Sequence, residues 1–310
     1  MTVNPILAFS ARRRMRSART ALLLTLYSLA VLIFGLAVAF GGFLKPQISI
    51  YTMADGQTGY AAMLAFQFFL LLLVTPAMTA GAISGERERQ TLDLLLVTHT
   101  GSLRIVLGKL LESLGLMVLL IFATLPAMCL VLITGSMTLS QVLEGLLFLS
   151  VTAFAMLSVG MLCSALLRRT VAATVTAYLA VFAIGLVTLL PLISDINSAR
   201  VMYDRMYSSY YNGPVAVIGG SDAAAGVRMT SFALNPALGL MSLIADQTGL
   251  LRGTLSSFSY TMYEMYDFMD FAGMAWQCMA FMAAAGIALD LLAACFVRPR
   301  KARIRKGKKA

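Results

Sequence analysis

Charged residues are scarce in this chain. Only 12% of its 310 residues are Asp, Glu, Lys or Arg, whereas roughly 25% are charged in an average soluble domain. Hydrophobic residues make up 59%, and several apolar runs reach the roughly 20 residues that a bilayer-spanning helix needs. The composition therefore excludes a soluble enzyme and predicts a multi-pass membrane protein.

Residues that usually hold metals or form disulfides are also few. The single histidine, His99, lies in a polar stretch, where we expect it to be solvated. The four cysteines lie inside apolar runs and form no Cys-x-x-Cys pair, so we expect small buried side chains and no metal site. They are Cys129, Cys163, Cys278 and Cys295.

A phosphate-binding loop is missing as well. Gly-Lys occurs at 108–109 and at 307–308, but Leu110 and Lys309 stand where Ser or Thr is required. HExxH and GxSxG motifs are likewise absent. We therefore expect no catalytic residue and no ATP hydrolysis in this chain, and no cofactor bound by it.

Six apolar segments are predicted to span the membrane. Each must be a helix, because backbone amides cannot remain unpaired in lipid. Pro76 and Pro126 are expected to kink the second and third spans. The predicted fold is all-α, with residues 1–310 forming one transmembrane domain. The spans lie at 21–44, 60–83, 105–134, 142–167, 171–193 and 272–297.

The basic residues indicate which side of the membrane is which. Nineteen of the 24 lysines and arginines fall in segments that six spans place on one side, at 12–19, 87–109, 168–169 and 298–309. Basic residues near span ends stay cytoplasmic, so both termini are predicted to be cytoplasmic. The net charge of +10 then reports topology and contact with anionic lipids, and not nucleic-acid binding.

Two segments outside the spans have their own patterns. Residues 1–20 mix arginines with apolar side chains, which suits an interfacial amphipathic helix or simply charge that sets topology. Residues 194–272 form the predicted outer loop, within which Asn235 and Pro236 begin a helix as N-cap and first residue. Its apolar part is too short to span, so it is predicted to be re-entrant or interfacial. The basic tail 298–310 follows the last span.

The densest mixed-sign charge cluster lies in the loop between the second and third spans, residues 84–104. Glu86 and Glu88 fall in what would be the first turn of a short helix, where acids favour the positive end of the helix dipole. Leu92, Leu95 and Leu96 follow at helical spacing and form one apolar face. Such a helix could dock in a groove of a cytoplasmic partner or lie on lipid.

The sequence of this loop, "ISGERERQTLDLLLVTHTGSLRIVLGKLL" (83–111), resembles the segment between the second and third spans of ABC-2-type transporter permeases. The departures are Gln90 where Gly is frequent, Asp93 in place of Glu, and His99 where Pro is common. The matching positions are Ser84, Gly85, Glu86, Arg87, Glu88, Arg89, Thr91, Leu92, Leu94, Leu95, Leu96, Gly108, Lys109 and Leu110.

The resemblance implies a function. In that family the loop is a coupling helix that sits in a groove of a separate cytoplasmic ATPase subunit, which binds ATP and Mg. It also implies a second permease subunit (homodimer or paralogous heterodimer), export, and a bacterial cell membrane. The alternatives, an ion-coupled secondary transporter and a membrane-embedded enzyme, would need repeat symmetry or catalytic motifs. The implied coupling residues are Gly85, Glu86, Arg87, Glu88, Arg89, Thr91, Leu92, Asp93, Leu95 and Leu96.

Two ionisable residues, Glu112 and Asp290, are predicted at membrane depth. Lys109 and Glu112 are three apart on one helix and can pair. Asp290 is costly in a span and is therefore paired or functional. Arg168 or Arg169 could reach it in an ion pair, or Asp290 could lie on a substrate or proton path.

Overall fold

A computed structural model describes residues 18–38, 51–90, 102–133, 137–195, 197, 201, 230–249 and 270–297. Within these ranges all regular structure is α-helical, and six helices are long and apolar enough to cross a bilayer. The predicted all-α membrane fold is thereby confirmed. The predicted N-terminal interfacial helix and the basic tail lie outside the described residues, except for the last residues of the former.

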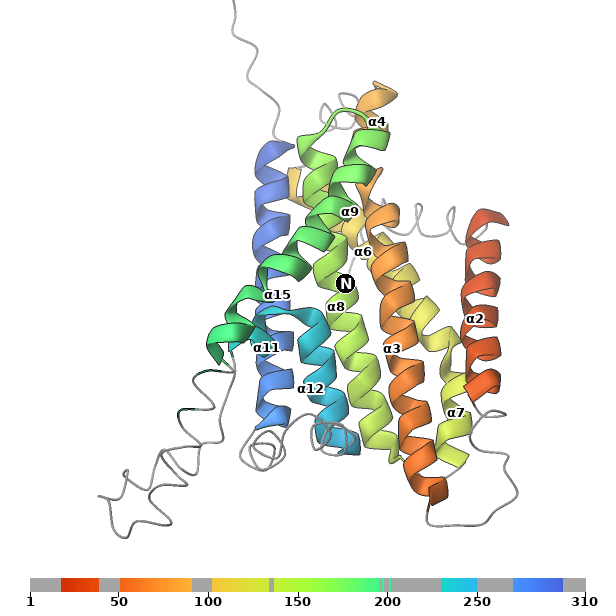
Figure 1. Cartoon of the computed structure of the whole chain (residues 1–310). Coiled ribbons are helices and arrows are strands. Elements are labelled where there is room, and N and C mark those ends of the chain that lie inside the picture. The colour runs from red at the N-terminus through yellow and green to blue at the C-terminus, as the bar shows by residue number, and fades with distance from the viewer. Residues whose placement is uncertain are drawn as a thin grey trace, which may run out of the picture.

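The six predicted spans each coincide with a helix (Figure 1). They are α2 (Ala18–Val38), α3 (Tyr51–Ala80), α6 (Ser102–Ala123), α8 (Leu139–Leu166), α9 (Thr170–Val187) and α15 (Phe271–Phe296). Four shorter helices are α4 (Ser84–Glu88), α7 (Leu125–Ile133), α11 (Thr230–Leu234) and α12 (Pro236–Thr248). Helix α3 begins nine residues before the predicted span, since its polar first turns gave no apolar signal, and the predicted third span is divided between α6 and α7.

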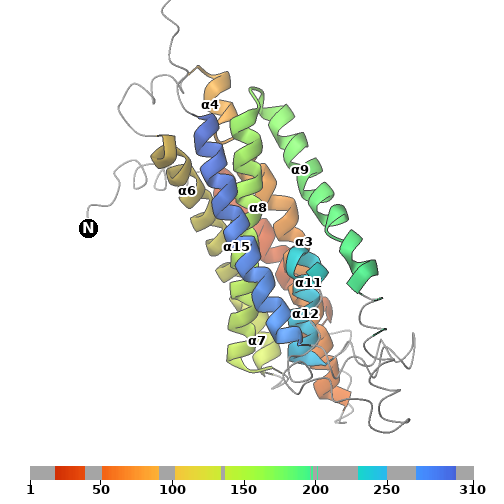
Figure 2. The ribbon, with the colours of Figure 1, turned by 90° about the vertical axis from the view of Figure 1, so that its left-hand side faces the viewer.

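Helix α8 is the centre of the bundle. In its most apolar stretch 67% of the residues are buried within the chain, and it packs against α3, α6, α9 and α15. Small residues allow close approach: a Cβ on Gly160 would meet Thr79 of α3, and one on Gly286 of α15 would meet the Phe154 ring at 2.6 Å. By contrast, only 6% of the α9 span is buried, and α9 lies at the edge of the bundle (Figure 2).

The two prolines inside spans act differently. The third span is broken near Pro126, where α6 ends at Ala123 and α7 begins at Leu125. Proline breaks a helix because it lacks a backbone N–H and its ring clashes with the preceding turn. Gln67, fully buried in α3, donates from Nε2 to Thr124 Oγ1 at this break, over 2.5 Å. The second span runs through Pro76 without interruption, and Tyr178 of α9 donates to the Leu73 carbonyl one turn earlier.

The predicted helix in the outer loop is present as α12. Asn235 Oδ1 accepts hydrogen bonds from the backbone N–H groups of Ala237 and Leu238, at 2.8 and 3.4 Å. Pro236 occupies the first turn, and Gly249 ends the helix with a left-handed φ of 65°. One face of α12 packs against α15, α3 and α8, so this helix lies beside the bundle and does not cross it (Figure 1).

The described segments that carry or adjoin basic residues lie toward one end of the molecule. Helix α4, the turn between α8 and α9, and the last turn of α15 lie at the upper end in Figure 1, and α2 begins on the same side but lower down. Helices α7 and α12 lie toward the opposite end. This arrangement is the one that the distribution of lysine and arginine predicts for a six-span chain.

Candidate functional site at the charged junction

Helix α4 joins the end of α3 to three other helices. We call α4 and its partners on α6, α8 and α9 the junction. Its backbone continues from α3 through a turn, with hydrogen bonds from Gly85 N to Gly81 O and from Arg87 N to Ile83 O. The helix ends at Glu88, and Gln90 has a φ of 59°. The predicted amphipathic helix is therefore interrupted before its leucines.

A pair of serines starts α4. Ser164 Oγ of α8 accepts hydrogen bonds from the N–H groups of Ile83 and Ser84, at 2.9 and 3.0 Å. The Ser84 hydroxyl in turn donates to the Ala80 carbonyl over 2.8 Å. Ile83 is the N-cap residue and has no side-chain cap of its own, so Ser164 satisfies donors that the end of a helix leaves unpaired. Both serines are fully buried.

Arg87 and Glu88 of α4 bind the turn between α8 and α9. Arg87 Nη1 donates to the carbonyls of Ala165 and Leu167, at 3.1 and 3.4 Å. Glu88 Oε2 accepts from the Thr170 hydroxyl at 2.8 Å and from its N–H at 3.3 Å. A cation thus lies at the C-terminus of α8 and an anion at the N-terminus of α9, and each arrangement favours the dipole of its helix.

The remaining acid of α4 pairs with α6. Lys109 Nζ lies 2.6 Å from Glu86 Oε1 and donates to the Ala82 carbonyl over 2.6 Å. Lys109 was predicted to pair with Glu112 on its own helix, but the structure places its ammonium group on α4. The reason is tertiary: α3 and α4 bring an acid and a free carbonyl to the same point. Both side chains of the pair are about three-quarters buried.

The predicted coupling residues thus fall into three sets. Gly85, Glu86, Arg87 and Glu88 belong to the junction and connect four helices of the chain itself. Arg89 follows on the exposed surface of the same end. The other predicted residues lie outside the described residues, namely Thr91, Leu92, Asp93, Leu95 and Leu96.

The predicted intramembrane residue Asp290 lies between α15 and α8 and is 4% exposed. Its Oδ2 is 3.0 Å from Ser158 Oγ. Arg168 and Arg169, its proposed partners, are exposed at the end of α8 and form no ion pair with it. Glu112 is partly buried on α6.

Sequence reasoning missed the residues that receive these charges. Ser164, Thr170 and Ser158 are ordinary polar residues in or beside spans, and each is about 80 to 130 positions from its partner. The one available signal was Thr170, which directly follows two arginines at the start of a span. Such a residue is a candidate for helix capping, but the sequence does not indicate its partner.

A second polar cluster lies at the other end of the bundle. Tyr60 Oη of α3 is 3.0 Å from Gln247 Oε1 of α12, and Gln247 Nε2 donates to Glu144 Oε2 of α8 over 3.1 Å. Partial burial, followed by the charges of Glu144 and Asp270, raises the pKa of Asp246. These contacts connect α12 to the two helices at the centre of the fold.

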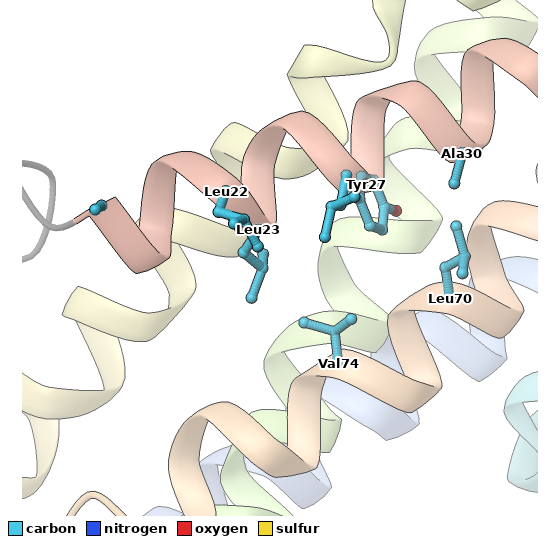
Figure 3. A pocket seen from close by; sticks show the side chains of 8 residues that line it. Leu22, Leu23, Tyr27, Ala30, Leu70 and Val74 are labelled. Carbon is cyan, nitrogen blue, oxygen red and sulfur yellow. The ribbon is translucent and has the colours of Figure 1, made fainter.

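An apolar groove separates the first two spans. It has a volume of about 540 Å³ and is lined by Leu22, Leu23, Tyr27 and Ala30 of α2 and by Leu70 and Val74 of α3, among others (Figure 3). Its walls carry almost exclusively hydrocarbon. Tyr27 carries the polar group among the lining side chains, a hydroxyl, and no lining residue is charged. The groove is separate from the junction.

The fold and the junction define a class: a multi-pass helical membrane protein whose loop between the second and third spans connects four helices. A comparison with protein families matches residues 44–289 to the ABC-2 family transporter protein. The match covers most of the chain, which therefore belongs to this family and is a permease component of an ABC transporter. A comparison with curated proteins gives no match.

Proposed function

We propose that this chain is the permease subunit of an exporter in which a separate cytoplasmic ATPase subunit drives the spans through the junction. The carrying observation is that three consecutive residues of α4 each bind a different helix: Glu86 binds α6, Arg87 the end of α8, and Glu88 the start of α9. A force applied to α4 would therefore be distributed over four spans at once.

In this proposal the docking surface is the segment just beyond α4. Arg89 is exposed and not engaged in the contacts of the junction, and the family resemblance extends through Leu92, Leu95 and Leu96. Leucines at helical spacing suit a groove on a partner protein. ATP and Mg bind to the partner, because the permease sequence has no phosphate-binding loop.

A second permease subunit completes the proposed transporter. Helix α9 has more free surface than any other span described, with 6% of its residues buried, and its exposed side chains include Val175, Leu179 and Phe182. Because Thr170 at its start is bound by Glu88, a subunit packed on α9 would be joined mechanically to α4. Native mass spectrometry of the purified complex should give two permease and two ATPase subunits.

The docking part of the proposal is tested with Leu95→Ala and Arg89→Glu in the complete transporter. Truncation of a leucine that fills a partner's pocket should weaken capture of the ATPase subunit by about tenfold or more. Reversal of an exposed charge at the rim should have a smaller effect that fades at high salt. The readouts are co-purification of the ATPase subunit, and ATP hydrolysis in the presence and absence of transported substrate.

Each variant has a matched control in the same chain. Leu111→Ala removes a leucine that is 49% exposed on α6, and Arg168→Glu reverses an exposed charge at the same end of the molecule. Both should leave capture and hydrolysis unchanged. Wild-type capture and wild-type hydrolysis in both test variants would show that the segment beyond α4 does not dock.

A further inference from the structure

Ser158 makes two contacts that require more hydrogen atoms than it has. Its Oγ is 2.9 Å from the Phe154 carbonyl, one turn earlier in α8, and 3.0 Å from Asp290 Oδ2 of α15. A serine hydroxyl has one hydrogen and can donate only once. A carbonyl oxygen and an ionised carboxylate are both pure acceptors, so one of the two contacts would lack a hydrogen if Asp290 were charged.

We infer that Asp290 is a proton-binding site, in which the carboxylic acid holds a proton between α8 and α15 and donates it to Ser158 Oγ. The hydroxyl of Ser158 then donates to the Phe154 carbonyl, and both contacts are hydrogen bonds. The other oxygen, Oδ1, is buried and has no hydrogen-bond partner in the described part of the chain. An unpaired buried oxygen costs far less free energy when it belongs to a neutral carboxylic acid than when it belongs to a charged carboxylate.

Among the residues that the structure describes, no cation compensates a charge at this point. The helices packed against α15 are α6, α8, α11 and α12, and α11 has no titratable side chain. None of the titratable residues on the others, or on α15 itself, makes a hydrogen bond or ion pair with Asp290 in the described structure. They are Arg104, Lys109 and Glu112 on α6, Glu144 and Cys163 on α8, Asp246 on α12, and Cys278 and Cys295 on α15.

Helices α8 and α15 are also packed too closely beside Asp290 to admit a larger ligand easily. Gly286 lies one turn before Asp290, and a Cβ there would meet the Phe154 ring at 2.6 Å and Ser158 Oγ at 3.3 Å. Asp290 is 4% exposed. The proton is therefore the one ligand small enough for this site, and its release would place an unpaired charge beside the most buried helix of the bundle. The inference goes beyond transport and does not depend on the coupling proposal.

The direct test is infrared spectroscopy of the purified full-length protein. The spectrum of wild type minus Asp290→Asn should show the carbonyl band of a protonated carboxylic acid at neutral pH, and this band should disappear at alkaline pH. Asparagine has the same shape, is neutral, and can donate to Ser158, so the variant should fold. Carboxylate bands at neutral pH in place of the acid band would overturn the inference.

Variants of Ser158 give an independent test that does not need Asp290→Asn. Loss of the hydrogen-bond acceptor in Ser158→Ala should shift the acid band, because the protonated carboxyl group then lacks the oxygen to which it donates. The matched control is Ser150→Ala, because the Ser150 hydroxyl donates to Leu146 O on the same helix and does not contact Asp290. An acid band with the same position and the same pH dependence in both serine variants would contradict the assignment.

Thermal unfolding gives the third readout. A proton bound in the folded state contributes stability at low pH that is lost as the pH rises through the point of release. Wild type should therefore lose stability relative to Asp290→Asn as the pH rises from about 4, where an unfolded aspartate releases its proton, to the pH at which Asp290 releases its own, and the difference should be constant above that pH. A wild type that gains stability relative to the variant with rising pH would mean that the native state holds a carboxylate.

Discussion

Gln90 has a backbone conformation that its side chain does not favour. Its φ of 59° lies in the left-handed region, which costs an L-residue roughly 1–2 kcal/mol and costs glycine nothing comparable. The related permeases often have glycine at this position, which the sequence comparison could note but not explain. The geometry supplies the reason: the left-handed φ at this position is one that glycine adopts without strain.

The unfolding temperature of variants at Gln90 should follow the backbone preference of the new residue. Gln90→Gly should unfold at or above the wild-type temperature, because relief of strain offsets the greater freedom of the unfolded chain. Gln90→Val should unfold at a lower temperature, since a β-branched residue is poorly tolerated at positive φ. Thermal unfolding in detergent measures both, and equal stability of the two variants would rule out this conformation.

At the scale of the element, helix termini determine how α4 is held. Arg87 lies at the C-terminus of α8 and Glu88 at the N-terminus of α9, so two neighbouring charges of opposite sign bind the two ends of one turn. This explains why the motif alternates acid and base. A single sign would favour one of the two helix dipoles and oppose the other.

Removal of the anion should loosen the first turn of α9. Glu88→Ala eliminates the acceptor for Thr170 and should cost about 0.5–2 kcal/mol, as the loss of a helix cap does. Glu88→Gln retains an acceptor oxygen and should cost less. Amide hydrogen exchange at residues 170–173 should accelerate in the alanine variant; unchanged exchange there would argue against the cap.

Close packing of helices gives a second prediction at this scale. Gly286→Ala would bring a methyl group against Phe154 and force α8 and α15 apart, at a cost of about 1–3 kcal/mol. Gly115→Ala on α6 is the matched control, since nothing lies within 4 Å of its added Cβ. Thermal unfolding should separate the two variants, and a Gly286→Ala protein as stable as Gly115→Ala would show that the contact is loose.

At the scale of the whole molecule, the bundle has two chemically different ends. The described cations of α4 and of the turn between α8 and α9 lie at one end, whereas the acids Glu144, Asp246 and Asp270 lie in or beside the other (Figure 1). The asymmetry agrees with the positive-inside rule, and it predicts that the junction faces the cytoplasm.

Reporter fusions test this orientation. Fusions at residues 140 and 220 should report the outer side, and a fusion at residue 310 should report the cytoplasm. The first position begins α8 at the end opposite α4, and the last follows the basic tail. A C-terminal reporter on the outer side would be incompatible with six spans and a cytoplasmic N-terminus.

The sequence alone was sufficient for features that depend on neighbouring residues. The lengths of the apolar runs predicted six spans, and Asn235-Pro236 predicted the start of α12. The positions of the lysines and arginines predicted that α4, the turn between α8 and α9, and the end of α15 lie at the same end of the bundle. In these cases the cause is local: burial of the backbone in lipid or capping of a helix requires no knowledge of distant residues.

Only the tertiary structure decided which partners the charges have. Lys109 meets Glu86 23 residues away, Glu88 meets Thr170 82 residues away, and Asp290 meets Ser158 132 residues away. The sequence offers each charged group several partners, and the packing of apolar helices selects among them. Membrane helices pack through small residues and close contacts, and those contacts bring together residues that the sequence leaves far apart.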